Sequence, residues 1–134
     1  KIMTYYFLFT KEKVFEDPRL NVFFNQLYTF LVNRFGFERI QNELLLDGMI
    51  ALIMQEETPG PKFNKIEFIT SDSDIFRYLK LNIKSLTLKS FVVSDDLIII
   101  TTIWNYNIYI KYTQLELSSV EYNDIFLRNK TEII

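Results

Sequence analysis

Apolar residues recur at three- and four-residue steps between Pro18 and about Phe35, which places them on one face of an amphipathic helix. Asp17 is suited to cap the start of such a helix, Pro18 to occupy its first position and Gly36 to end it. The pattern therefore predicts a helix over residues 18–35 whose apolar stripe faces a core. The stripe consists of Leu20, Phe23, Phe24, Leu27, Phe30, Leu31 and Phe35.

The segment KIEFIT, residues 65–70, alternates as a strand does. The earlier run ELLL, residues 43–46, predicts a short buried strand that leads into Asp47-Gly48. MIALIMQ, residues 49–55, is too short for its period to separate helix from strand, and TPGPK, residues 58–62, predicts a loop. SDSD offers an N-cap for a second helix over residues 74–83. In the strand, Ile66, Phe68 and Thr70 share one face, and Lys65, Glu67 and Ile69 share the other.

The second half of the chain is rich in β-forming runs separated by turn residues, which predicts an antiparallel meander. SFVV and LIIITTIW are apolar enough for buried strands, and a further hairpin is expected around residues 122–124. The N-terminal KIMTYYFLFT is interpreted as a first strand or a lead-in segment. The order of elements predicts one α+β domain over residues 1–134, with a mixed, mainly antiparallel sheet and helices packed chiefly on one face.

Composition removes several classes of chemistry, because the chain has no Cys and no His. Disulfides, thiolate or imidazole metal sites and histidine acid/base catalysis are therefore excluded. What remains is chemistry by carboxylates, hydroxyls, Lys, Arg or a carboxylate-bound hard metal. No run approaches the ~20 apolar residues of a membrane span. We expect a cytoplasmic protein that does not enter a membrane.

The formal charge of −2 argues against general nucleic-acid binding, which depends on a positive field. One modest basic stretch could contact RNA or a nucleotide by stacking and charge. It consists of Arg77, Lys80, Lys84 and Lys89, interleaved with Phe76, Tyr78 and Phe91.

Residues 44–72, from LLLDGMIALIMQ through the loop to NKIEFIT, resemble the core of the minimal nucleotidyltransferase fold, of the type found in abortive-infection toxins. In that family an apolar strand leads to Gly-Gly or Gly-Ser at the start of a helix, and the next strand carries Asp-x-Asp. The resemblance implies a nucleotide-binding role for Gly48, whose backbone would approach a triphosphate. Asp47 stands at the other glycine position, where its charge would repel phosphate.

The Asp-x-Asp positions are occupied by Lys65 and Glu67. Two acids on one strand face normally hold the metal ions of the reaction, so a lysine at one position prevents the usual two-metal site. The family's third acid would fall in LIIITTIW or NIYIKYT, and neither run contains Asp or Glu. We therefore interpret the chain as a catalytically inactive nucleotidyltransferase-like domain without a cofactor, with Lys65 and Glu67 as vestigial site residues. In the simpler interpretation these two residues form a surface ion pair.

Such an inactive domain would serve a binding or complex-forming role, with an unidentified protein partner or by self-association. Trp104, Tyr106 and Tyr112 are the candidate partner-binding residues, because they would share one strand face with Ile108 and Ile110. That face is either core under the helices or an exposed patch.

Two alternatives stay open. In the first, the chain is an active magnesium-dependent nucleotidyltransferase whose carboxylates are displaced to Glu67, Asp72 and Asp74. Asp72 and Asp74 otherwise serve as helix caps. In the second, the chain is an unrelated α+β protein-interaction module.

Overall fold

The computed structural model describes residues 18–56, 65–86, 88–122 and 125–133. Their helices are α2 (Pro18–Phe35), α3 (Phe37–Glu43), α4 (Gly48–Glu56), α5 (Ser73–Asn82), α6 (Lys130–Ile133) and the 3₁₀ turn η1 (Ile83–Ser85). Their strands are β1 (Leu45–Asp47), β2 (Lys65–Thr70), β3 (Ser90–Val93), β4 (Leu97–Thr101), β5 (Asn107–Tyr112), β6 (Ser119–Tyr122) and β7 (Ile125–Arg128). The first predicted strand, the Asp17 cap and the TPGPK loop lie outside these ranges.

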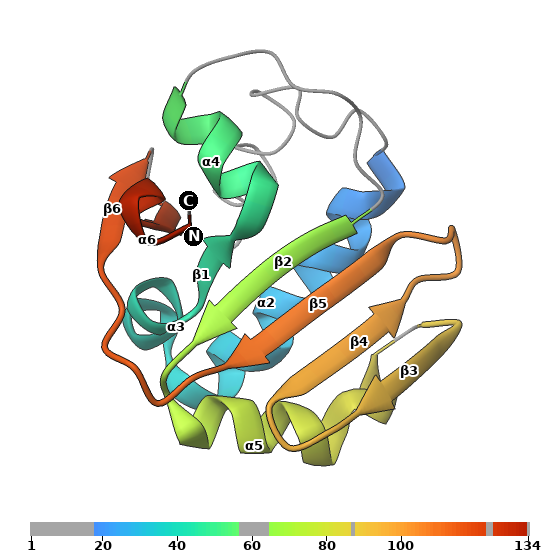
Figure 1. The fold of residues 1–134 in the computed structure, drawn as a ribbon. Coiled ribbons are helices and arrows are strands. Elements are labelled where there is room, and N and C mark those ends of the chain that lie inside the picture. The colour runs from blue at the N-terminus through green and yellow to red at the C-terminus, as the bar shows by residue number, and fades with distance from the viewer. Residues whose placement is uncertain (1–17, 57–64, 87, 123–124, 134) are drawn as a thin grey trace.

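All seven strands form one sheet in the order β3-β4-β5-β2-β1-β7-β6 (Figure 1). β2 runs parallel to β5, and β1 runs parallel to β7. The other four neighbouring pairs are antiparallel, including the predicted meander from β3 to β5. The predicted α+β class with a mixed, mainly antiparallel sheet is therefore confirmed.

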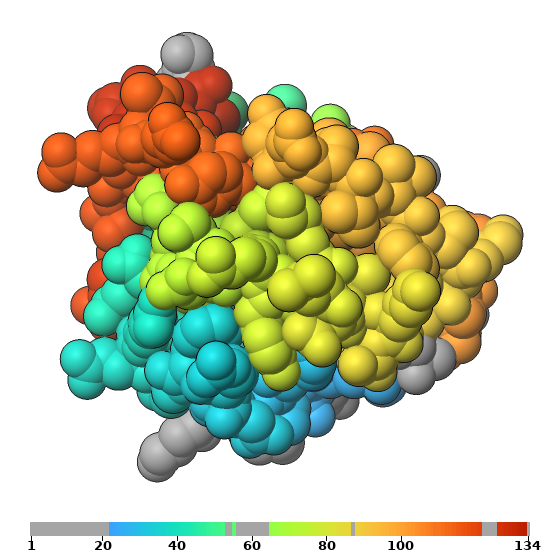
Figure 2. All heavy atoms as spheres, turned by 90° about the horizontal axis from the view of Figure 1, so that it is seen from below, coloured from blue at the N-terminus to red at the C-terminus, as the bar shows by residue number. Residues whose placement is uncertain are grey.

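The core lies between one face of the sheet and helices α2 and α5, with α3 beside α2 (Figures 1 and 2). The Phe68 ring on β2 makes edge contacts with the rings of Phe24 and Tyr28 on α2, at centroid distances of 5.7 and 6.2 Å. Farther along the same face, Phe76 on α5 stacks on Tyr112 of β5 at 5.4 Å. The alternation predicted for KIEFIT thus directs its even-numbered residues into the core.

Helices α4 and α6 lie on the opposite face of the sheet (Figure 1). Gln55 holds α4 to the corner between β7 and α6: its Nε2 donates to the carbonyl of Arg128 at 2.8 Å, and its Oε1 accepts from the N–H of Lys130 at 3.0 Å. The helices therefore divide between the two faces, with the larger number on the core side. None of the helices in the described ranges is both long and apolar enough to cross a membrane.

Three local features differ from the sequence predictions. Gly36, predicted to end α2, does so with φ of 90°, but the chain begins α3 at once. Helix α6 was likewise not predicted. SFVV was predicted to be buried, which is wrong: β3 is an edge strand, with Val92 62% exposed and Val93 39% exposed. An edge strand has a neighbour on one side only, so its apolar character did not imply burial.

Candidate functional site

Four charged side chains meet on the α4 side of the sheet, one from each of four adjacent strands. They are Asp47 on β1, Glu67 on β2, Lys111 on β5 and Arg128 on β7, and we call them the ion cluster. The register sets their positions, because Asp47 lies opposite Glu67 in the antiparallel β1–β2 pair. Four neighbouring strands thus place two carboxylates and two cations within reach of one another.

Lys111 is the centre of the ion cluster. Its Nζ lies 2.5 Å from Asp47 Oδ2 and 3.1 Å from Glu67 Oε1. Arg128 approaches the same Asp47 oxygen from the other side, with its Nη1 at 3.5 Å, while its Nε donates to Glu132 Oε1 at 3.3 Å. The four charges of the ion cluster therefore neutralise one another.

Asp47 is the buried member, with 1% of the residue exposed. A buried carboxylate is tolerated only when it is paired and hydrogen-bonded, because burial removes its hydration. Lys111 meets this need while one third of its own side chain, 32%, stays exposed. The buried position of Asp47 thus requires a cation beside it, and Lys111 is that cation.

Gly48 follows Asp47 directly, starts α4 and has φ of 70°, a conformation that L side chains rarely adopt. A Cβ added at this position would overlap the carboxyl group of Glu67. The missing side chain therefore provides the space in which the Glu67 carboxylate reaches Lys111. In this structure a carboxylate fills the position beside the glycine where the family resemblance expects a phosphate.

The three proposed magnesium ligands are not brought together. Glu67 belongs to the ion cluster, whereas Asp72 and Asp74 lie beyond the other end of β2, at the start of α5. Arg39 on α3 binds both aspartates, with its Nε 2.8 Å from Asp72 Oδ2 and its Nη2 3.5 Å from Asp74 Oδ2. Across the described residues no group of three acids is placed to hold a metal ion.

Asp72 is the N-cap of α5, as predicted for SDSD, because its side chain accepts from the N–H groups of Asp74 and Ile75. Burial raises the pKa of this carboxyl, but the hydrogen bond from Arg39 and the two backbone donors outweigh it. The pKa of Asp72 therefore lies below its ordinary value. The carboxylate stabilises the start of α5 and joins it to α3.

Lys65 lies at the exposed start of β2, with its Nζ 4.7 Å from the centroid of the Tyr109 ring. The simpler interpretation of a Lys65–Glu67 surface ion pair is wrong, because Glu67 pairs with Lys111 instead. Lys65 lies on the same face of β2 as Glu67, but it makes a cation–π contact with Tyr109 on the neighbouring strand β5 and not an ion pair with Glu67.

Trp104, Tyr106 and Tyr112 do not share an open strand face. β5 begins at Asn107, and Asn105 has φ of 68°, so Trp104 and Tyr106 belong to the turn before the strand. Tyr106 and Tyr112 are partly buried and pack against the core. Of the two interpretations, packing in the core under the helices therefore holds for Tyr106 and Tyr112.

Lys111 and Arg128 were missed from the sequence. An acid was expected in the strand NIYIKYT, whereas the charged residue of that run is Lys111. The sequence did contain a signal for the Asp47–Lys111 pair: a lysine within an apolar strand, and an aspartate at the end of a buried strand. Nothing local indicated Arg128, because β7 becomes a neighbour of β1 only in the folded sheet.

Comparison with known proteins gives no assignment. No protein-family model matches the chain, and neither the curated proteins nor the solved structures give a match.

Proposed function

We propose that this chain is a catalytically inactive, nucleotidyltransferase-like domain that serves a binding or complex-forming role. The observation that carries the proposal is the position of Lys111, whose ammonium group lies between the carboxylates of Asp47 and Glu67. In the family that the sequence resembles, carboxylates at this part of the sheet hold metal ions. Here a cation of the chain itself takes their charge.

The arrangement of strands supports the comparison. β1 leads through Gly48 into α4, the chain returns as β2 antiparallel to β1, and β5 lies on the other side of β2. This order places β5 directly beside β2, the strand that carries the two Asp-x-Asp positions and therefore Glu67. The strand that would supply the third acid supplies Lys111 instead.

The residues of the ion cluster do not fit a catalytic metal. A divalent ion needs about six oxygen ligands and a net negative site, whereas the ion cluster has two carboxylates already neutralised by two cations. A magnesium ion would have to displace the Lys111 ammonium from a carboxylate that is almost completely buried. We therefore derive no metal-dependent step at this site.

A titration followed by thermal unfolding tests the proposal. We titrate the chain with each of the four ribonucleoside triphosphates, with and without magnesium. We expect no stabilisation that both requires magnesium and is lost in the Glu67→Ala variant. A bound ligand at 100 times its Kd would add about 2.7 kcal/mol, so the shift would be easily measured. A magnesium-dependent shift lost in Glu67→Ala, or nucleotide incorporation by the unaltered chain, would overturn the proposal.

A charge-reversal variant provides the positive arm of this experiment. Lys111→Asp replaces the central cation with a third carboxylate, and we expect Mn²⁺ or Mg²⁺ to stabilise this variant but not the unaltered chain. Lys84→Asp, which makes the same charge change at an exposed position, is the matched control. Equal responses of the two variants to metal would show that these strands do not have the geometry of a metal site.

A further inference from the structure

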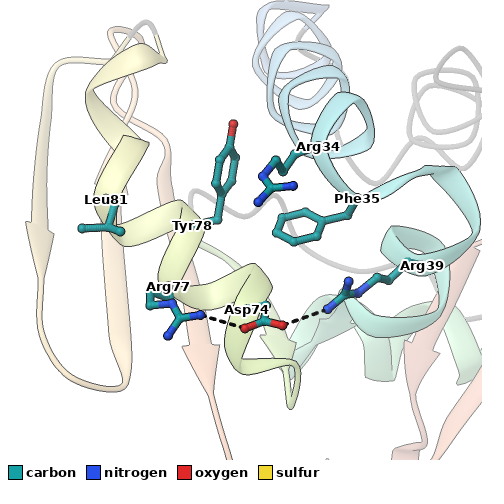
Figure 3. Close-up of a pocket in the computed structure, with 7 residues that line it drawn as sticks. All are labelled: Arg34, Phe35, Arg39, Asp74, Arg77, Tyr78 and Leu81. Carbon is teal, nitrogen blue, oxygen red and sulfur yellow. Dashed lines mark hydrogen bonds and ion pairs between the residues drawn. The ribbon is translucent and has the colours of Figure 1, made fainter.

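A groove of about 420 Å³ lies on the other face of the molecule, between the end of α2, the start of α3 and α5 (Figure 3). Three guanidinium groups line it, from Arg34, Arg39 and Arg77. It belongs to the side of the sheet that α2 and α5 cover, where α5 lies beside α2 and α3 (Figure 2). The groove is thus separated by the sheet from the ion cluster.

The charges around the groove are not balanced. Asp72 and Asp74 bind Arg39, and Asp74 also binds Arg77 at 2.9 Å. Arg34 contacts no carboxylate among the described residues. Three cations and two anions leave one positive charge in excess, on a chain whose overall formal charge is −2.

Arg34 is oriented by aromatic rings and not by an acid. Its guanidinium carbon lies 5.5 Å from the centroid of Phe35 and 5.7 Å from that of Tyr78, and Figure 3 shows it between the two side chains. Tyr78 is itself held by stacking on Phe30 at 5.0 Å. Stacking occupies the face of a guanidinium and leaves its in-plane N–H groups available, so Arg34 presents a preorganised set of donors.

Such donors match the oxygens of a phosphate group, which guanidinium groups bind by paired, charge-assisted hydrogen bonds. The volume falls within the range of ordinary small-molecule sites. Leu81, 75% exposed, lines the same groove and offers apolar surface to the organic part of a ligand. We propose that this groove binds the phosphate group of a small organic phosphate, with Arg34 as the principal ligand and Arg77 as the second.

The experiment is a calorimetric and NMR titration of the full chain in EDTA, with AMP, ribose 5-phosphate, inorganic phosphate and adenosine as probes. We expect binding by the phosphate-bearing probes and none by adenosine. Tighter binding of AMP than of ribose 5-phosphate would identify a nucleotide, and equal binding would identify a sugar phosphate as a sufficient ligand. Binding of adenosine equal to that of AMP would overturn the proposal. So would the absence of binding by any probe at concentrations up to about 10 mM, which is about ten times the Kd of a weak millimolar site.

Variants then locate the site. Arg34→Gln and Arg77→Gln should each weaken phosphate binding about tenfold or more, whereas Lys84→Gln, an exposed cation outside the groove, should leave it unchanged. Both arginines are on the surface, so unfolding curves should remain close to that of the unaltered chain. Affinity retained in Arg34→Gln and Arg77→Gln would refute the assignment. This result is independent of the proposed loss of catalysis, because EDTA removes any metal-dependent binding.

Discussion

Replacement of Lys111 by Met tests how strongly the ion cluster supports the fold. Met keeps the length of the aliphatic stem and removes the charge, which leaves Asp47 with Arg128 Nη1 at 3.5 Å as its remaining cation. At an effective dielectric constant of about 20, unit charges 2.5 Å apart attract by about 7 kcal/mol, but desolvation of the carboxylate offsets most of this. Breaking a buried pair typically destabilises by about 3–5 kcal/mol. Because Lys111 is 32% exposed and Arg128 stays, we expect a loss of about 2 kcal/mol.

Urea unfolding, followed by circular dichroism and by the fluorescence of the single Trp, measures this loss. Asp47→Asn and the double variant complete a mutant cycle, in which we expect a coupling energy of at least 1 kcal/mol. Arg77→Gln, which removes an exposed pair with Asp74, is the control and should change stability by less than about 1 kcal/mol. A loss below about 0.5 kcal/mol in Lys111→Met, with no coupling to Asp47, would refute the reasoning.

Two further predictions concern Gly48 and Asp72. Gly48→Ala should destabilise the fold by about 2 kcal/mol or more in chemical denaturation, because its φ of 70° is unfavourable for alanine and the new Cβ overlaps Glu67. Adding Glu67→Ala should relieve part of this loss, and the absence of any relief would show that the overlap is unimportant. Asp72→Asn should lower stability at pH 7 by about 1 kcal/mol, and the difference should shrink as the pH falls below about 4. The sign follows from the lowered pKa of Asp72, whose stabilising effect is present above its unfolded pKa and is lost in acid; a difference independent of pH would contradict it.

The local periodicity predicted much of the fold. α2 and β2 have the predicted bounds, and the capping signal at Asp72 correctly located the start of α5. The missed helix α3 shows the limit of this reasoning: Gly36 was read as a stop, and a positive φ that ends one helix also permits the next to begin immediately. The pairing of β1 with β7 could not be predicted, because alternation within a strand does not specify a distant neighbour.

The candidate site was harder to predict for a related reason. Glu67 was selected from a local motif, but its partner depends on the sheet order that places β5 beside β2. Asp47 was read as a charge that would repel a ligand, and its burial beside Lys111 became clear only when four strands were assembled. The groove around Arg34 combines α2, α3 and α5, so no single motif contained it.

The parallel pairing of β1 with β7 has a consequence for how the chain folds. Asp47 and its cation Arg128 are 81 residues apart in the sequence, so their contact closes a loop that includes most of the described elements. Long-range pairing of this kind slows folding, because the entropy of loop closure is lost before the contact forms. During synthesis β1 can pair with β2 early, but its other edge must wait for β7, so the contact between Asp47 and Arg128 becomes a late event in folding.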